Sequence, residues 1–272
     1  MRIIRFVSTE GDIYYGMPDP GDFDYARIIE GSIFDHYDVT QKRVRIGKLL
    51  PPVEAPNILA LGLNYRSHAD ETNISYPDIP IVFLKSTNSL IGAGSPILLP
   101  KAGPDQVDYE AELAVVIGRQ VKNIAPDKAM DAILGYTCGN DISARDWQFY
   151  KQKQQWARGK SFDTFCPLGP CLVTKEDIPD PGNLRIMTIL NGEVLQDSNT
   201  ANMIFDVPAI VSHLSRSMTL YPGTVILTGT PEGVGFTRQP PVFLKDGDTV
   251  TIRIEKIGEL TNPVKREKKE SN

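Results

Sequence analysis

The sequence is poor in the residues that build disulfides and metal–sulfur sites. Its 272 residues include three cysteines and three histidines. Cys138, Cys166 and Cys171 are an odd number and lack the spacing of a zinc or redox motif, so we expect reduced packing thiols in a cytoplasmic protein. The histidines lie far apart and no His-x-x-x-His pair occurs. This argues against a histidine-rich zinc hydrolase.

The sequence also lacks an excess of positive charge and long apolar runs. Lys and Arg number 29 and Asp and Glu number 34, which gives a formal net charge of −5. No global positive field therefore attracts nucleic acid or an anionic membrane. The longest apolar runs, such as residues 58–63, are far shorter than the roughly 20 residues of a spanning helix. The first residues lack the apolar core and cleavage site of a secretory leader, so we expect neither export nor a membrane partner.

Turn-forming residues are abundant, with 22 glycines and 21 prolines, and they indicate many short strands. We expect a mixed α+β protein that is mainly β. Residues 1–55 read as a small β domain that begins with a hairpin, and prolines at 51, 52 and 56 mark its end. Residues 56–264 form the second domain, with helices over 66–71, 126–134 and 206–218. Ser67 is the expected cap of the first helix and Asp206 of the last. A charged tail, 265–272, follows.

Three carboxylates follow one another on a predicted strand over residues 107–117. Asp108, Glu110 and Glu112 alternate with apolar residues and so share one face, which becomes apolar further along. One interpretation is a solvent-facing strand end; the other is a pair of oxygen ligands for a divalent cation. Asp141, at the end of a strand over 135–140, either caps the next helix, over 143–148, or completes the ligand set. Three carboxylates without His or Cys suit Mg²⁺, Mn²⁺ or Ca²⁺.

Other residues could supply acid–base chemistry. His68 and Glu71 stand three apart and share a helix face, as a base and its orienting carboxylate would, although such a pair is also common on surfaces. Lys160 follows a glycine and could stabilise an oxyanion, or lie in a surface loop. Lys85 ends a buried strand and either faces the same cleft or extends to solvent.

A glycine-rich loop over residues 228–235 follows a predicted strand. It lacks the Gly-Lys-Ser/Thr ending of a phosphate loop, and no helix pattern follows it, so we reject nucleotide binding. The loop lets the backbone or a threonine hydroxyl approach a ligand closely, unless it is a plain hairpin turn.

Taken in order, these segments resemble the fumarylacetoacetate hydrolase superfamily over residues 56–264. The segments that carry the resemblance are Gly62-Leu63-Asn64-Tyr65, His68-x-x-Glu71, Phe83-Leu84-Lys85, Asp108-Tyr109-Glu110-Ala111-Glu112-Leu113-Ala114, Asn140-Asp141-Ile142-Ser143-Ala144-Arg145-Asp146, Arg158-Gly159-Lys160-Ser161-Phe162-Asp163 and Thr228-Gly229-Thr230-Pro231. Residues 1–55 match loosely the small N-terminal β domain of many members.

The resemblance implies a β-roll catalytic domain and a homodimer. It implies Mg²⁺ or Mn²⁺, or Ca²⁺ in some members, held by Glu110, Glu112 and Asp141. It also implies a His68–Glu71 base dyad on a segment that closes as a lid, and a lysine that polarises the substrate carbonyl. The residues that complete the implied site are Lys160 as that lysine, with Lys85, Arg145, Gln148 and Thr230 binding the substrate.

A cation site of this kind binds a 2-oxo acid through its carboxylate and keto oxygens and stabilises an enolate. Our first hypothesis is hydrolysis of a C–C bond in a β-diketo or acylpyruvate acid, with His68 activating water. The alternatives are decarboxylation or tautomerisation of oxaloacetate, and isomerisation of a 2-hydroxyhepta-2,4-diene-1,7-dioate type of acid. A non-catalytic module that binds Ca²⁺ or a carboxylate is a third possibility. The side chains that would select the substrate are not identifiable from the sequence.

Overall fold

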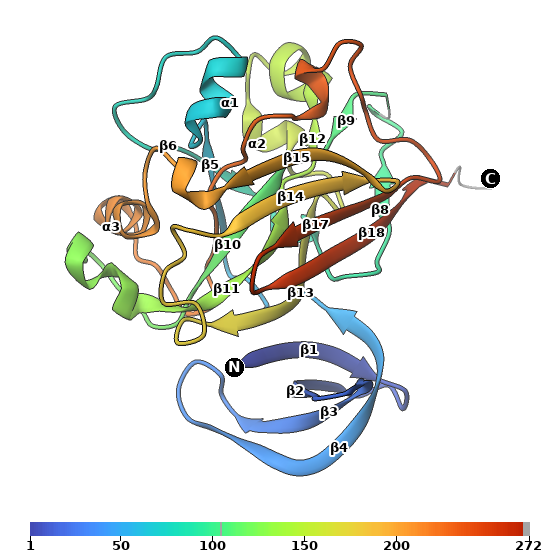
Figure 1. Cartoon of the computed structure of the whole chain (residues 1–272), viewed down its shortest axis with the longest axis vertical. Coiled ribbons are helices and arrows are strands. Elements are labelled where there is room, and N and C mark those ends of the chain that lie inside the picture. The colour runs from blue at the N-terminus through green and yellow to red at the C-terminus, as the bar shows by residue number, and fades with distance from the viewer. Residues whose placement is uncertain (104, 269–272) are drawn as a thin grey trace.

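Strands dominate the computed structural model, which describes residues 1–103 and 105–268 (Figure 1). This confirms the expected mainly-β mixed fold. The strands are β1 (Arg2–Ser8), β2 (Ile13–Asp19), β3 (Asp22–Gly31), β4 (Tyr37–Leu50), β5 (Ile58–Gly62), β6 (Ile81–Lys85), β7 (Leu90–Ile91), β8 (Ile97–Leu99), β9 (Val107–Asp108), β10 (Ala111–Ile117), β11 (Ile133–Asn140), β12 (Ser143–Ala144), β13 (Cys166–Thr174), β14 (Arg185–Leu190), β15 (Glu193–Asn199), β16 (Val225–Leu227), β17 (Thr249–Ile254) and β18 (Gly258–Arg266).

Strands β1 to β4 form a small unit at the N-terminal end, drawn in blue at the bottom of Figure 1. The expected hairpin is present, because β1 and β2 pair antiparallel around the turn at residues 9–12. β1 also pairs with β4, and at Arg2 and Ile3 it pairs with β13 of the larger part. The unit is therefore hydrogen-bonded into the main sheet. The domain boundary after residue 55 stays a prediction.

The main sheet continues from β1 through β13, β11, β10, β16, β5 and β6. β10 lies at its centre, and each of its seven residues is buried. The expected single strand over 107–117 is instead β9 and β10, separated by Tyr109 and Glu110. The acidic face does not reach solvent, since Asp108, Glu110 and Glu112 are all buried. The interpretation of this segment as a solvent-facing strand end is therefore wrong.

A second sheet, in the order β15-β14-β17-β18-β8, lies over β10, β11 and β13 (Figure 1). Strand β18 runs through Arg266, so it includes the first two residues of the predicted tail; residues 269–272 lie outside the described part. The main core fills the space between these sheets with side chains such as Leu113, Tyr136 and Ile252.

The helices are short. They are α1 (Arg66–Glu71), α2 (Trp156–Gly159), α3 (Val207–Ser217), the 3₁₀ turns η1 (Thr87–Ser89), η2 (Pro126–Ala132), η4 (Thr200–Asn202) and η5 (Gly235–Thr237), and the π-helix η3 (Trp147–Lys151). Each helix in the described ranges is too short or too polar to cross a bilayer.

Two capping predictions have opposite outcomes. Asp206 caps α3, accepting a hydrogen bond from the Ala209 N–H at 2.8 Å. Ser67 does not cap α1: the capping position is Tyr65, and the Ser67 hydroxyl donates to Glu232 instead.

The two other expected helices also differ from the sequence interpretation. The segment at 126–134 is a 3₁₀ turn that ends at Ala132. Residues 143 and 144 form β12, because they pair with β9, so the following helix starts later than expected.

Candidate active site

Three carboxylates meet where β10 begins and β11 ends. Glu110 lies just before β10, Glu112 lies within it, and Asp141 follows β11 directly. Each offers an oxygen atom, and these three atoms lie within 4.8 Å of one another. All three residues are buried, with exposed fractions of 5% or less. The strand pairing explains this convergence, since Ala111 and Asn140 are register partners in the β10–β11 ladder.

Two lysines partly neutralise this cluster. The Lys160 ammonium donates to Glu110 Oε2 at 2.8 Å, to Asp141 Oδ2 at 2.6 Å and to the Ser143 hydroxyl at 2.7 Å. Lys85 donates to Asp141 Oδ1 from the opposite side. Burial acts to lower the pKa of Lys160, but the charges of Asp141 and Glu110 outweigh it and raise the pKa. Lys160 is therefore charged.

Glu112 is the carboxylate with the least compensation. Its Oε2 accepts the Gly229 N–H at 2.6 Å, whereas its Oε1 is buried and has no hydrogen-bond partner among the described residues. Burial raises the pKa of Glu112 far above its ordinary value, and the negative charges of Asp141 and Glu110 raise it further. An unpartnered buried oxygen is costly, and a divalent cation would remove that cost. These three oxygen donors thus fit a hard cation such as Mg²⁺ or Mn²⁺.

The glycine-rich loop explains the contact to Glu112. Gly229 has φ +96°, and a Cβ atom there would lie 2.7 Å from the Cβ of Asn64. Glycine at this position lets the backbone N–H approach the carboxylate closely. The loop backbone therefore approaches an acidic side chain of the site, whereas its approach to a ligand stays a prediction.

A fourth buried carboxylate, Asp108, holds an arginine. Asp108 accepts the Arg145 Nε–H at 2.9 Å and the backbone N–H groups of Gly235 and Phe236 at 2.8 and 3.0 Å. Arg145 Nη1 contacts Glu110 Oε1 at 2.7 Å, and its guanidinium stacks on the Phe236 ring at 4.4 Å. Burial acts to raise the pKa of Glu110, but Lys160 and Arg145 outweigh it and lower the pKa to about 2.

The histidine–glutamate pair is formed on α1. His68 Nδ1 lies 2.7 Å from Glu71 Oε1. Glu71 Oε2 accepts the Gly233 N–H at 3.0 Å and the Thr237 hydroxyl at 3.1 Å. Burial acts to raise the pKa of Glu71, but the hydrogen bonds from His68 and Gly233 outweigh it and hold the pKa below its ordinary value. An ionised carboxylate only accepts hydrogen bonds, so His68 Nδ1 carries the proton of this contact.

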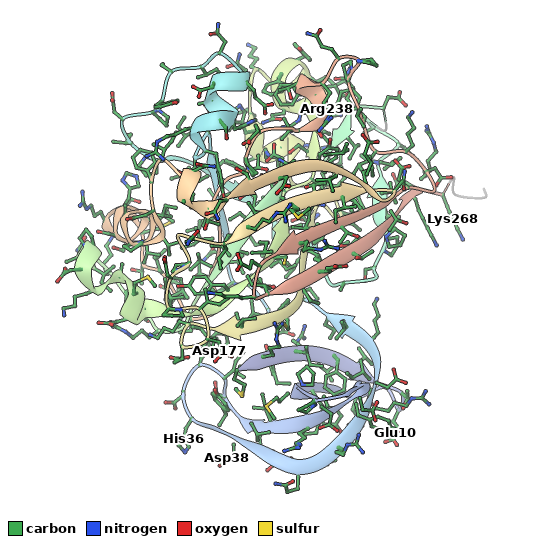
Figure 2. The ribbon with its side chains drawn as sticks, viewed as in Figure 1. Glu10, His36, Asp38, Asp177, Arg238 and Lys268 are labelled. Atoms are coloured by element: carbon green, nitrogen blue, oxygen red, sulfur yellow. The ribbon has the colours of Figure 1, made fainter. Side chains whose placement is uncertain are left out.

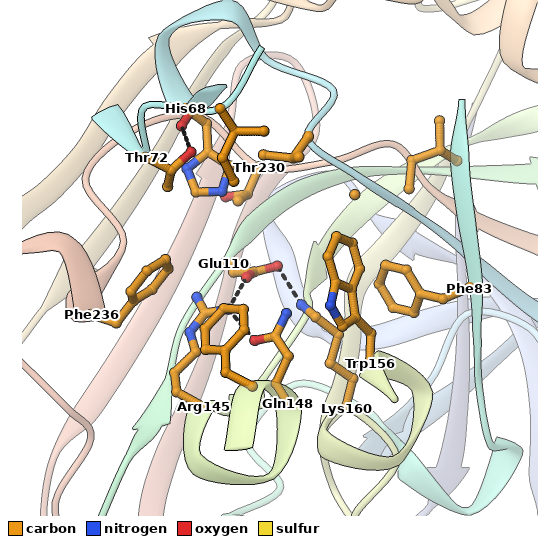
Figure 3. Close-up of a pocket in the computed structure, with 15 residues that line it drawn as sticks. His68, Thr72, Phe83, Glu110, Arg145, Gln148, Trp156, Lys160, Thr230 and Phe236 are labelled. Carbon is orange, nitrogen blue, oxygen red and sulfur yellow. Dashed lines mark hydrogen bonds and ion pairs between the residues drawn. The ribbon is translucent and has the colours of Figure 1, made fainter. Parts of the chain in front are cut away.

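Some of these groups line one small cavity of about 60 Å³. His68 stands on one side of the Glu110 carboxylate, and Arg145, Gln148 and Lys160 stand on the other (Figure 3). Thr230 completes the polar lining. Aromatic side chains form much of the remaining wall, namely Phe83, Phe149, Trp156 and Phe236. Such walls exclude water and strengthen electrostatic interactions inside.

Known proteins share both the sequence and the fold. Residues 57–265 match the family model described as "Fumarylacetoacetate (FAA) hydrolase C-terminal". The chain belongs to the fumarylacetoacetate hydrolase family. It is 49% identical over 222 residues to the Xenopus laevis protein named "Oxaloacetate tautomerase fahd2, mitochondrial", covering 82% of this chain and 69% of that protein.

Solved structures of the fumarylacetoacetate hydrolase family extend the likeness to nearly the whole chain. A 2-hydroxyhepta-2,4-diene-1,7-dioate isomerase from Mycobacterium marinum is 43% identical, with a TM-score of 0.84, and covers 99% of this chain and 100% of its own. A fumarylacetoacetate hydrolase from Exiguobacterium antarcticum is 36% identical, with a TM-score of 0.85, and covers 98% and 100%. This chain is therefore similar to tautomerase, isomerase and hydrolase members of the family.

The structure brings together most of the residues that the sequence singled out. His68, Glu110, Arg145, Gln148, Lys160 and Thr230 line the cavity, with Glu71, Glu112 and Asp141 directly behind them. Lys85 lies outside that lining, as the described residues define it, and its ammonium contacts Asp141. The other two histidines lie elsewhere: His36 is on the N-terminal unit, labelled in Figure 2, and His213 is on α3.

Sequence reasoning missed several residues of this family site. Asp108 was noticed within the acidic run but was given no partner. Gly233 was noticed within the glycine-rich loop but was given no partner. Thr237, which with Gly233 holds Glu71, and Gln196, which contacts Thr230, were not singled out. Their contacts join segments more than 30 residues apart, and no local pattern indicates them. The aromatic walls were visible only as scattered residues.

Proposed function

We propose that this protein is a divalent-cation-dependent tautomerase of small 2-oxo dicarboxylic acids, with oxaloacetate as the first substrate to test. The observation that carries the proposal is the composition of the cavity of about 60 Å³. One member of the base dyad, one member of the acidic triad and several donors for carboxylate groups line it, and the other members of the dyad and the triad lie directly behind them. The named relatives add support, since the Xenopus laevis protein is called an oxaloacetate tautomerase and the Mycobacterium marinum protein an isomerase of a dioate.

Substrate binding follows from the donors in the cavity. Mg²⁺ or Mn²⁺ held by Glu110, Glu112 and Asp141 would supply an electrophile for the keto and carboxylate oxygens of a 2-oxo acid. Arg145 has one buried nitrogen, Nη2, that makes no hydrogen bond among the described residues, although it lies 2.9 Å from Asp108 Oδ2. It can donate to a substrate carboxylate. Gln148 lies beside it, with its carbonyl oxygen 2.8 Å from Arg145 Nη1.

Proton transfer is assigned to His68. With Nδ1–H donated to Glu71, the Nε2 lone pair takes a proton from carbon 3 of the keto acid. Returning that proton to the oxygen on carbon 2 completes the conversion of keto to enol, so no other reactant is consumed. Glu71 stabilises the imidazolium that exists between the two transfers. Lys160 uses all three of its N–H groups on protein oxygens, so its support is the positive charge beside the developing enolate.

The cavity favours tautomerisation over the hydrolysis that the sequence placed first. A dry cavity of about 150 Å³ holds one benzene molecule, and this one is smaller. A four-carbon acid therefore needs less opening of α1 than a long acylpyruvate together with an attacking water. Tautomerisation also requires no water, which the aromatic walls exclude. Hydrolysis of a C–C bond stays as the rival outcome of the same assay.

The test follows the ultraviolet absorbance of enol-oxaloacetate with Mg²⁺, with Mn²⁺ and with a chelator. We expect metal-dependent conversion that falls about 10²- to 10⁴-fold in His68→Ala, as for loss of a general base. His213→Ala, on α3, is the matched control and keeps full activity. Hydrolysis of acetylpyruvate at a higher kcat/KM than oxaloacetate conversion would favour the hydrolase assignment. Release of pyruvate from oxaloacetate would favour a decarboxylase.

The remaining expectations from the family resemblance are part of this proposal. They are a homodimer, Mg²⁺ or Mn²⁺ as the cation, with Ca²⁺ as the alternative, and a catalytic domain over residues 56–264. The cytoplasmic location stays a prediction, whereas the Xenopus laevis relative is named as mitochondrial.

A further inference from the structure

Gln196, a buried residue of β15, contacts the cavity lining from behind. Its exposed fraction is 1%, and it does not line the cavity itself. Its side-chain oxygen accepts the Ala111 N–H at 3.0 Å and the Thr188 hydroxyl at 2.6 Å. Its side-chain nitrogen donates to the Thr230 hydroxyl oxygen and to the Pro231 carbonyl, both at 2.9 Å.

The direction of these hydrogen bonds is fixed by two backbone groups. The Ala111 N–H can only donate, so the Gln196 atom facing it is the oxygen. The Pro231 carbonyl can only accept, so the atom facing it is the nitrogen. An amide nitrogen has no lone pair to offer, and therefore Thr230 must accept from Gln196. A flipped amide would place donor against donor and acceptor against acceptor.

This acceptance controls the Thr230 proton. A threonine hydroxyl has one hydrogen, and in the described part of the chain Thr230 makes no hydrogen bond besides the one it accepts. Thr230 lines the cavity, so its O–H is left to donate there. The preceding residue, Gly229, donates to Glu112, so Thr230 lies beside the acidic triad. The ligand group it meets is the end of the substrate nearest that triad.

We propose that Gln196 is a positioning residue that keeps the Thr230 hydroxyl proton free to donate to an anionic oxygen of the substrate. The inference rests on the proposed function, because it names the end of the 2-oxo acid that binds at Thr230. The hydroxyl has one proton and two lone pairs, and the Gln196 amide occupies one lone pair. The proton therefore cannot be donated to Gln196, and an anionic oxygen in the cavity can accept it.

The test compares Gln196→Glu, Thr230→Val and Thr188→Val with the wild type. Gln196→Glu keeps the size of the side chain and the acceptor for Ala111. The ionised side chain of the variant can only accept, so it would accept from the Thr230 hydroxyl. The protonated side chain has one proton for two acceptors, the Thr230 hydroxyl and the Pro231 carbonyl. In neither form is Thr230 forced to accept. Thr188→Val is the matched control, since it removes another hydrogen bond to the same amide without changing the amide's direction. Each variant's fold is checked by circular dichroism before kinetics.

We expect Gln196→Glu and Thr230→Val each to raise KM for oxaloacetate about tenfold to a hundredfold, the loss for one hydrogen bond to a charged group. Thr188→Val should stay within about threefold of the wild type. In the double variant Gln196→Glu/Thr230→Val, KM should equal that of Thr230→Val alone, because both changes remove the same contact. Losses that multiply, or an unchanged KM in a folded Gln196→Glu, would overturn the inference.

Oxalate binding measured by calorimetry with Mg²⁺ separates this inference from the proposed function. If the wild type converts no oxaloacetate but oxalate affinity follows the pattern above, the function fails and the inference stands. If oxaloacetate is converted but oxalate affinity is equal in all variants, the inference alone fails. A wild type that binds no oxalate also overturns the inference.

A structure of the oxalate complex provides a test if Gln196→Glu does not fold. Thr230 Oγ1 should lie about 2.5–2.7 Å from an oxalate oxygen, the distance of an O–H donor to an anion, while still accepting from Gln196. A separation greater than about 3.5 Å from every oxalate oxygen would refute the assignment.

Discussion

Replacing Asp108 by asparagine tests how much a buried ion pair contributes to the free energy of unfolding, compared with an exposed ion pair in the same protein. Asp108 is fully buried and accepts from Arg145, which is 3% exposed. Asparagine keeps the size and one acceptor oxygen, but it removes one of the two carboxylate charges, of Asp108 and Glu110, that balance the guanidinium. Breaking a buried pair by removing one partner costs about 3–5 kcal/mol. We expect a loss of that size in the free energy of unfolding.

The chain provides a matched control in the pair Arg185–Asp197. Its two hydrogen bonds, at 2.8 and 2.6 Å, resemble those of the buried pair, but the two side chains are 59% and 42% exposed. Because solvent screens such pairs, Asp197→Asn should cost less than about 1 kcal/mol.

Urea unfolding followed by circular dichroism measures both losses under the same conditions. Asp108 also accepts from the backbone of Gly235 and Phe236, in the loop whose neighbouring groups hold Glu71. We therefore expect Asp108→Asn to lower kcat as well as stability. Equal losses for the two variants would refute the reasoning, as would an Asp108→Asn protein that loses less than about 1 kcal/mol.

Three further outcomes follow from the buried groups. The proposed function predicts that Mg²⁺ or Mn²⁺ raises the Tm of the wild type and that Glu112→Gln abolishes this rise. The substitution should leave the metal-free protein as stable or more so, because it removes an uncompensated carboxylate. A metal-induced shift in Tm that is retained in the variant would contradict this. Burial raises the pKa of Cys166 to about 12, so at pH 8 only about one Cys166 thiol in 10⁴ is ionised. A thiol reagent should therefore react with Cys166 far more slowly in the native protein than in the protein unfolded by urea. Equal reaction rates would contradict the burial of Cys166. The pKa of Glu71 is held below its ordinary value mainly by His68, against the effect of burial. The contribution of the Glu71 charge to the free energy of unfolding is therefore full above about pH 4.5 and is lost as the pH falls through the folded-state pKa. The difference in stability between the wild type and Glu71→Gln should shrink on acidification. A difference that grows would contradict a lowered pKa for Glu71.

The acidic triad could be predicted because its members are close in sequence or end neighbouring strands. Glu110 and Glu112 are two residues apart, and Asp141 follows the strand that pairs with β10. The burial of these carboxylates could not be predicted, since the face of β10 that Glu112 shares with Ala114 is covered by distant segments such as β5, β6 and β13. The alternation of acidic and apolar residues is equally typical of a strand with one wet face.

The positioning residues could not be found from local patterns for a similar reason. Ser67 has the spacing of a helix cap, but in the fold its hydroxyl meets Glu232, 165 residues later. Gln196 lies in an ordinary polar strand, and its importance comes from Thr230, which reaches it through another loop. Motifs predict which groups do the chemistry, whereas the groups that orient them depend on tertiary contacts.

The pairing of strand β1 has a consequence for attempts to isolate residues 56–264. It belongs to two ladders at once, since Arg2 and Ile3 pair with β13 and the following residues pair with β2 and β4. A fragment starting at residue 56 would leave part of β13 as a bare strand margin with open N–H and C=O groups. Exposed edge strands pair with other chains, so we expect the shortened protein to aggregate more readily than the intact one. The N-terminal unit thus protects the edge of β13 from intermolecular pairing.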